Sequence, residues 1–288
     1  MNNKKAILSV NIAVFFFGMA GLFAKFLSLP AIGITFGRVF FSSIALFIFC
    51  KIRRQSIRIS QLRHLFILIG AGIILAFHWW SYLQSIQIST VAIGTITFSA
   101  FPLFVTFLEP LFFKERLKLK NVCLAVLTLV GVFITVPDFS LSSSKTAGII
   151  IGMFSSFAYA VLTLINRYCA KYYESITISL YEQGTAAVVL LPFIVLIPMQ
   201  PTLKDIGLLV ILGVFSTALA HSLFTNSLKR LPAQLAGIVA SMESVYGILL
   251  ALVILGEIPS PQEVIGAVII ISAAVLGQMT QAKQPEAA

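Results

Sequence analysis

The side chains best suited to chemistry in this sequence are a few polar and charged groups set within long apolar stretches. Glu243 lies near the middle of one such stretch. A carboxylate at membrane depth is costly and commonly marks a proton or cation pathway. His78 and His221 lie in similar settings, and histidine exchanges protons near neutral pH. We therefore predict Glu243, His78 and His221 as proton-coupling residues, while hydrogen bonds between helices remain the alternative for each.

Arg38 is a cation in a second apolar stretch, roughly two helical turns from its end. A guanidinium at that depth needs a partner or water. Arg38 therefore either pairs with a carboxylate for structure or contacts an anionic substrate, and the sequence leaves both open. Trp79, Trp80 and Tyr82 could stack on an aromatic or cationic substrate, and we predict this role for Trp80 and Tyr82.

Several expected helices carry polar side chains on one face at helical spacing. Such stripes should face the interior of a bundle when lipid surrounds it. Ser and Thr often bond to carbonyls of their own helix, so only part of this polar set is expected to bind a substrate. The predicted substrate-cavity residues are His78, Trp80, Tyr82, Ser99, Tyr159, Asn166, His221, Asn226, Glu243 and Tyr246.

Backbone features should position these groups. Gly18 should allow a neighbouring helix to approach closely. Pro102 and Pro110 should kink their helix or free carbonyls toward polar neighbours. Thr202 and Asp205 have the spacing of a capping box at a helix start.

Catalytic and cofactor motifs are missing from the sequence. It contains no Walker sequence, no HExxH pair and no nucleophile elbow, and its Cys and His residues lack the spacing of metal ligands. We therefore expect no enzyme activity, no metal site and no cofactor.

The composition indicates an integral membrane protein. The 288 residues are 59% hydrophobic and 10% charged, and the mean hydropathy is +1.01. A helix that spans the hydrocarbon needs about 20 mostly apolar residues. Ten runs meet this description, so we predict an all-α fold of ten transmembrane helices at 6–27, 31–50, 64–87, 90–113, 121–136, 147–169, 175–197, 204–228, 233–256 and 261–280.

The net charge of +10 reports topology and contact with anionic lipids, and we expect no nucleic-acid partner. With both termini inside, most Lys and Arg residues lie in inner segments, whereas the outer loops hold only Lys145 and Lys204. This asymmetry predicts a multi-pass protein of the cell's inner membrane with cytoplasmic N and C termini, the tail being residues 282–288.

A histidine-bearing helix followed by a helix that ends in glutamate occurs twice, from His78 to Glu115 and from His221 to Glu257. The halves 1–137 and 146–281 each hold five predicted helices. An odd number per half places the second repeat upside down relative to the first, and such inverted repeats place a central cavity at their interface near the midplane. Glu115 and Glu257 are expected to be hinge and helix-cap groups.

The ten-helix pattern, the segment FFKE after the proline-containing fourth helix, and ESVYGILLALVILGE in the ninth resemble EamA-type exporters of the drug/metabolite transporter superfamily. Two departures are Ser244, where the family often has proline, and Lys114, where glycine commonly precedes the glutamate. The resemblance implies a cavity enclosed by helices, alternating access, and gradient-driven or facilitated export of small metabolites.

We therefore predict a secondary transporter, and an exporter by resemblance, for amino acids or related neutral or aromatic compounds. Its partners should be the substrate and membrane lipids, and it should act as a monomer or homodimer. The alternative is a non-transporting membrane subunit, for example a partner in lipid-carrier flipping. Polar stripes inside the bundle weigh against this alternative.

Overall fold

The computed structural model describes residues 3–114, 117, 119–134 and 144–282, and all regular secondary structure in this part of the chain is helical. The first half contains α1 Asn3–Phe26, α2 Ala31–Ile52, α3 Leu62–Ile88, α4 Val91–Phe98, α5 Phe101–Phe113 and α6 Leu119–Ile134. The second half contains α7 Ser144–Cys169, α8 Ser175–Leu196, α9 Leu203–Gly213, η1 Val214–Leu219, α10 Ala220–Ser227, α11 Ala233–Ala240, α12 Met242–Leu250, η2 Ala251–Leu255 and α13 Pro261–Ala282. Glu115 and all but the first residue of the predicted tail lie outside the described residues.

Eight helical segments of the described chain are long and apolar enough to span a membrane. Three of them are composite: α4 continues into α5, α9 into η1 and α10, and α11 into α12 and η2. The fifth and tenth predicted spans correspond to α6 and α13, whose apolar parts are shorter, at Leu119–Gly131 and Val264–Ala273. The all-α membrane architecture is therefore confirmed.

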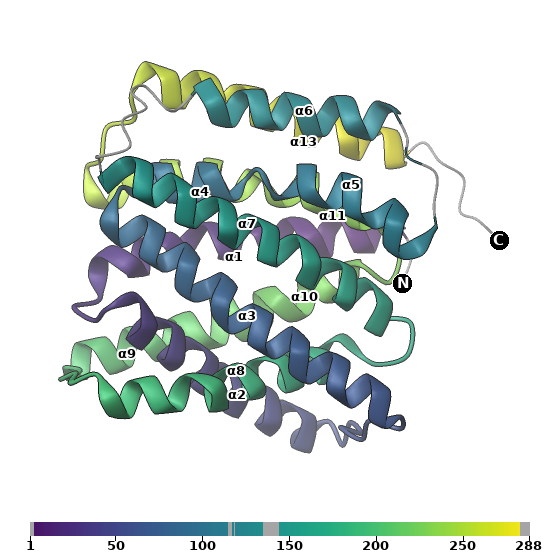
Figure 1. Cartoon of the computed structure of the whole chain (residues 1–288), viewed down its shortest axis with the longest axis vertical. Helices are drawn as coiled ribbons and strands as arrows, with labels where there is room; N and C mark the ends of the chain where they lie inside the picture. Colours follow the sequence, from purple (N-terminus) through teal and green to yellow (C-terminus); the bar gives the residue numbers. More distant parts are fainter. Residues whose placement is uncertain (1–2, 115–116, 118, 135–143, 283–288) are drawn as a thin grey trace.

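The helices lie side by side in one bundle (Figure 1). The beginning of α1 and the end of α13 lie at the same end, which we call the terminal end. Pairs of helices from the two halves pack together: α2 with α8, α6 with α13, α3 with α7, and α1 with α10 and α12. The largest group of buried apolar side chains also draws on both halves.

The outer surface of the bundle is apolar. Large side chains such as Phe66, Leu111, Val188 and Val253 are more than half exposed. A contiguous apolar surface of this kind is unfavourable in water and favourable against lipid chains. The distribution fits a multi-pass membrane protein.

The fourth predicted span is interrupted at Ser99 and Ala100, between α4 and α5. Pro102 has no N–H to donate to the Phe98 carbonyl four residues earlier. That carbonyl instead accepts a hydrogen bond from the Ser156 hydroxyl on α7, at 2.9 Å. The prediction that this proline would free a carbonyl toward a polar neighbour is confirmed.

The corresponding span of the second half is also interrupted, at Ser241 between α11 and α12, although Ser244 replaces the family's proline. The Ser244 hydroxyl donates to the Ser241 carbonyl at 2.8 Å. The two interruptions contact each other: the Ser99 hydroxyl donates to the Ser241 carbonyl at 3.2 Å, and the Ser241 hydroxyl to the Ser99 carbonyl at 3.4 Å. The interruptions therefore meet where the halves join.

Gly18 is in close contact with α12. A Cβ atom at this position would lie 2.5 Å from the Tyr246 Cβ and 3.2 Å from the Glu243 carbonyl oxygen. No real side chain fits there without movement of α1 or α12. The predicted close approach at Gly18 is confirmed, and it brings the helix that carries Glu243 to the bundle centre.

Candidate functional site

A small cavity of about 10 Å³ lies at the centre of the bundle. This is the space of roughly one water molecule. Its walls come from six helices of both halves, and the lining residues are Phe17, Ala20, Arg38, His78, Trp79, Tyr82, Phe98, Tyr159 and Glu243. We call Arg38, His78, Trp79, Tyr82, Tyr159 and Glu243 the central cluster. This space is too small for a molecule the size of a metabolite.

Arg38 reaches the cavity from α2 and is 1% exposed. Its Nε donates to the Thr217 hydroxyl at 3.0 Å and its Nη2 to the Ser216 carbonyl at 3.3 Å. Both acceptors belong to η1, a π-helical turn, and such turns leave carbonyls available to side chains and often occur at functional sites. The guanidinium carbon lies 4.0 Å from the centre of the Trp79 ring. These contacts fix Arg38 while Nη1 keeps no protein partner.

Glu243 reaches the cavity from the first turn of α12, directly after the interruption at Ser241. Free N–H groups at a helix start favour a negative charge. The Tyr82 hydroxyl on α3 donates to Glu243 Oε1 at 2.7 Å. Arg38 is close enough to interact electrostatically with both residues. A cation and a carboxylate therefore face the same small space.

His78 is held at the cavity wall by α7. Its Nδ1 lies 2.8 Å from the Ser155 hydroxyl oxygen, and that hydroxyl lies 2.9 Å from the His78 carbonyl. The Tyr159 ring lies against the imidazole, with 4.6 Å between ring centres. Phe98 packs against both rings at 5.2 and 5.3 Å. The wall opposite the charged groups is thus aromatic.

The structure brings five predicted residues together at this cavity: Arg38, His78, Tyr82, Tyr159 and Glu243. The remaining predicted cavity residues lie elsewhere and do not line it. Their positions show which other parts of the bundle carry polar groups.

Trp80 is partly exposed and packs against Phe77, with ring centres 5.9 Å apart. Trp79, its neighbour in sequence, is 3% exposed and lines the cavity instead. Tyr246 packs edge to face against Phe15 on α1, at 5.7 Å. Ser99 lies in the interruption between α4 and α5.

Asn166 and His221 belong to a second polar group, between α7, α8 and α10. His221 Nε2 lies 2.7 Å from Glu182 Oε2, and both side chains are fully buried. Asn166 lies beside Glu182. We call Glu182, His221, Asn166 and Thr225 the imidazole–carboxylate cluster. Asn226 lines a separate groove between α2, α8 and α10.

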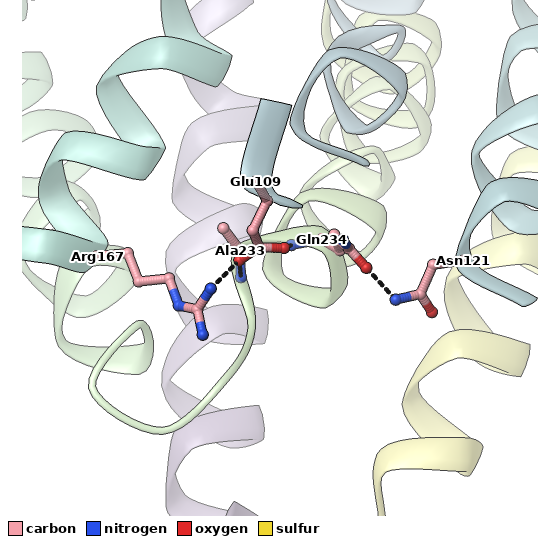
Figure 2. A network of polar contacts seen from close by, with 5 residues as sticks. All are labelled: Glu109, Asn121, Arg167, Ala233 and Gln234. Atoms are coloured by element: carbon pink, nitrogen blue, oxygen red, sulfur yellow. Dashed lines mark hydrogen bonds and ion pairs between the residues drawn. The ribbon is translucent and has the colours of Figure 1, made fainter. Parts of the chain in front are cut away.

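A third polar network closes the terminal end of the bundle (Figure 2). Glu109 on α5 is fully buried, and its Oε1 accepts from Arg167 Nη1 at 2.5 Å. The same carboxylate accepts the backbone N–H groups of Ala233 at 2.7 Å and Gln234 at 3.0 Å, at the start of α11. The Gln234 side chain in turn accepts a hydrogen bond from Asn121. One carboxylate therefore joins α5, α7 and α11.

The opposite end is also held together by polar contacts. Asp205 and Thr202 form the predicted capping box at the start of α9, which is confirmed. Asp205 additionally accepts from the Ser28 backbone at 3.2 Å and the Ser28 hydroxyl at 2.9 Å. This carboxylate ties α9 to the loop between α1 and α2.

The sequence interpretation wrongly chose Trp80 over Trp79 for the cavity, and it missed Glu109 and the partnership of Glu182 with His221. Glu109 could have been noticed as an acid between apolar residues and directly before Pro110. Glu182 is likewise an acid within an apolar span. Nothing in the sequence distinguishes Trp79 from Trp80, because the direction of each depends on how α3 is rotated in the bundle.

Comparison with known proteins identifies the family. The model of the EamA-like transporter family matches residues 4–136 and again residues 146–277. The chain belongs to this family. Membership in this family indicates that the protein is a membrane transporter.

Curated relatives cover nearly the whole chain. An uncharacterized transporter of Archaeoglobus fulgidus is 26% identical over 260 residues, which are 90% of this chain and 91% of the relative. A protein of Rickettsia bellii named as an S-adenosylmethionine uptake transporter is 26% identical over 281 residues, or 95% and 94% of the two chains. These relatives indicate a membrane transporter with a small-molecule substrate.

A solved crystal structure has the same fold. It superposes with a TM-score of 0.79 over 98% of this chain and 100% of its own, at 17% sequence identity. At that identity the match concerns the fold alone.

Proposed function

We propose that this protein is a secondary transporter that moves a small zwitterionic metabolite with an aromatic or similarly flat group across the membrane by alternating access. The observation that carries the proposal is the pairing of Arg38 and Glu243 in the wall of one central cavity among aromatic rings. A substrate carboxylate would bind Arg38, and a substrate amine or sulfonium would bind Glu243. The rings would stack on the remainder. The uptake named for the Rickettsia bellii relative concerns a molecule of this chemical class.

Two inverted repeats of five helices, 1–137 and 146–281, form part of the proposal. The family model matches each half separately. The packing pairs are also reciprocal: α3 against α7 corresponds to α1 against α10, and α4 against α12 corresponds to α5 against α11. In this arrangement α6 and α13 are the fifth and tenth spans, and both termini lie in the cytoplasm. Alternating access then consists of one half rocking against the other around the central cluster.

Polar contacts at the two ends of the bundle act as the gates of this motion, because they must break before either end can open. Glu109 and its partners close the terminal end, and Asp205 with Ser28 closes the other. The substrate reaches the centre when one set of contacts opens. The direction of transport follows from the driving gradient. The family resemblance implies export, whereas the Rickettsia relatives are named for uptake. A gradient-driven carrier of this design moves its substrate in whichever direction the gradient favours.

The experiment is counterflow in proteoliposomes. Labelled S-adenosylmethionine, amino acids and nucleobases are offered to vesicles loaded with unlabelled compound, with and without a pH gradient. We expect saturable exchange of at least one zwitterionic compound. Trp79→Phe should raise its KM and Trp80→Phe should not. Absence of exchange for every compound tested, at normal protein recovery, would contradict the proposal and favour the non-transporting subunit.

A further inference from the structure

Glu182 on α8 and His221 on α10 form a buried pair that the central cavity does not include. His221 Nε2 and Glu182 Oε2 are 2.7 Å apart, and neither side chain has any exposed surface. Both residues lie well inside membrane-spanning segments, Ser175–Leu196 and Leu203–Ser227. An acid and an imidazole in hydrogen-bond contact and out of water form a unit that can gain or lose one proton.

The imidazole of this pair keeps one nitrogen without a protein partner. Among the described residues, His221 Nδ1 is buried and has no protein hydrogen-bond partner, and the Thr225 hydroxyl on the next turn of α10 has none either. Unmatched buried polar groups lower stability. His221 Nδ1 can therefore form a further hydrogen bond when the protonation of the pair changes. In the Glu109 network, in contrast, an arginine and two backbone N–H groups donate to the carboxylate.

One proton changes the charge of this layer by a full unit. With Glu182 ionised and His221 neutral, the pair carries one negative charge, and with one more proton it carries none. Charge differences act strongly where water is excluded. The protonation state of the pair should therefore change the electrostatic energy of other charged groups in the bundle centre.

Few titratable groups face the pair from the neighbouring helices. They are Arg38 on α2, His78 on α3, and Tyr159 and Cys169 on α7. On α8 itself, Tyr181 donates its hydroxyl to the Ile57 carbonyl. The α10 segment contributes no titratable side chain besides His221.

Trp79 connects the pair to the central cluster. The Arg38 guanidinium lies over its ring at 4.0 Å, and the His221 imidazole meets the ring edge to face, with 5.7 Å between centres. The indole ring is therefore in contact with both Arg38 and His221. Protonation of the pair can therefore bias the charge balance of the substrate site without sharing its ligands.

We propose that Glu182 and His221 form the proton-binding site of this transporter, separate from the central cluster that binds the substrate. The proposal rests on the proposed function and assigns the proton coupling of that transporter to Glu182 and His221.

The direct test needs no substrate. The chain has three histidines, so ¹⁵N-histidine solid-state NMR of the protein in liposomes can follow each ring, with His221→Gln and His78→Gln used for assignment. We expect the His221 ring signals to change as pH falls and the pair takes up a proton. Glu182→Gln should alter this change, and Glu243→Gln should alter it less.

The proposal is overturned if the His221 ring signals do not change with pH in the wild-type protein, or if they change identically in Glu182→Gln. A transport measurement adds a second criterion: Glu182→Gln should keep counterflow exchange and lose the response to an imposed pH gradient. Retained gradient-driven accumulation in this variant also overturns the proposal. Because the NMR measurement contains no substrate, its failure is distinguishable from failure of the transporter proposal, which counterflow alone decides.

Discussion

Glu109 and Glu243 are two buried carboxylates on corresponding spans of the two halves, and their surroundings differ. Glu109 accepts from Arg167 and from two backbone N–H groups at the start of α11. Glu243 accepts from the neutral Tyr82 hydroxyl and faces a cavity that also contains Arg38. The first carboxylate is matched by partners within the protein, whereas the second has direct contact with one neutral donor and with open space.

The difference shows that burial alone does not give a membrane carboxylate its role. A carboxylate matched by a cation and helix N–H groups holds neighbouring helices together while those contacts last. A carboxylate that faces a cavity beside a cation can exchange its partners for those of a ligand. Glu182 represents a third arrangement, with an imidazole as its partner.

The largest expected effect is on stability, from Glu109→Gln. This substitution leaves Arg167 without its carboxylate and replaces the acceptor of the Ala233 N–H group. Breaking a buried ion pair costs about 3–5 kcal/mol. We expect a clearly lower thermal unfolding temperature in detergent, measured by fluorescence-detected size exclusion.

The double variant Glu109→Gln with Arg167→Gln is the matched control for this prediction. It removes the Arg167 cation together with the Glu109 carboxylate and should recover part of the lost stability. Unchanged stability of the single variant would show that the Glu109 carboxylate does not hold α5, α7 and α11 together.

The second prediction concerns transport by Glu243→Gln. The variant keeps the shape of the side chain and a group that can accept from Tyr82, so folding should be nearly unaffected. It loses a charged hydrogen bond to the substrate cation, which is worth about 1.5–3 kcal/mol. We expect transport to fall about tenfold to a hundredfold at unchanged unfolding temperature, measured as counterflow of the substrate found. Wild-type transport at every pH would exclude both a binding and a coupling role for Glu243.

The third and smallest predicted effect concerns how α12 is positioned. Gly18→Val should push α1 away from Tyr246 and so displace the helix that carries Glu243. Overpacking of this kind typically costs about 1–3 kcal/mol. Gly70→Val is the matched control, because a Cβ at Gly70 meets nothing within 4 Å. Equal unfolding temperatures for the two variants would contradict the close contact.

Much of the architecture could be predicted from the sequence because lipid imposes simple rules. Long apolar runs predicted the helices. Pro102 predicted a carbonyl free to bind a polar neighbour, and Gly18 predicted a close contact between helices; the structure contains both. Glu243 was noticed because charged groups at membrane depth are rare. Its substrate and coupling roles remain predictions, as do those of His78 and His221.

The sequence itself determined the membrane-spanning helices and their polar faces. Helix formation and partition into lipid depend on local composition, which the apolar pattern of the sequence records. Only the tertiary structure decided which polar groups meet. Trp79 lines the cavity and Trp80 does not, because neighbouring residues on a helix point about 100° apart and packing sets the rotation of α3. Glu182 contacts His221, and Glu109 contacts Arg167 and the start of α11. In each case the partners are 39 or more residues apart in the chain. Such long-range pairings depend on how helices dock, and no local pattern encodes them.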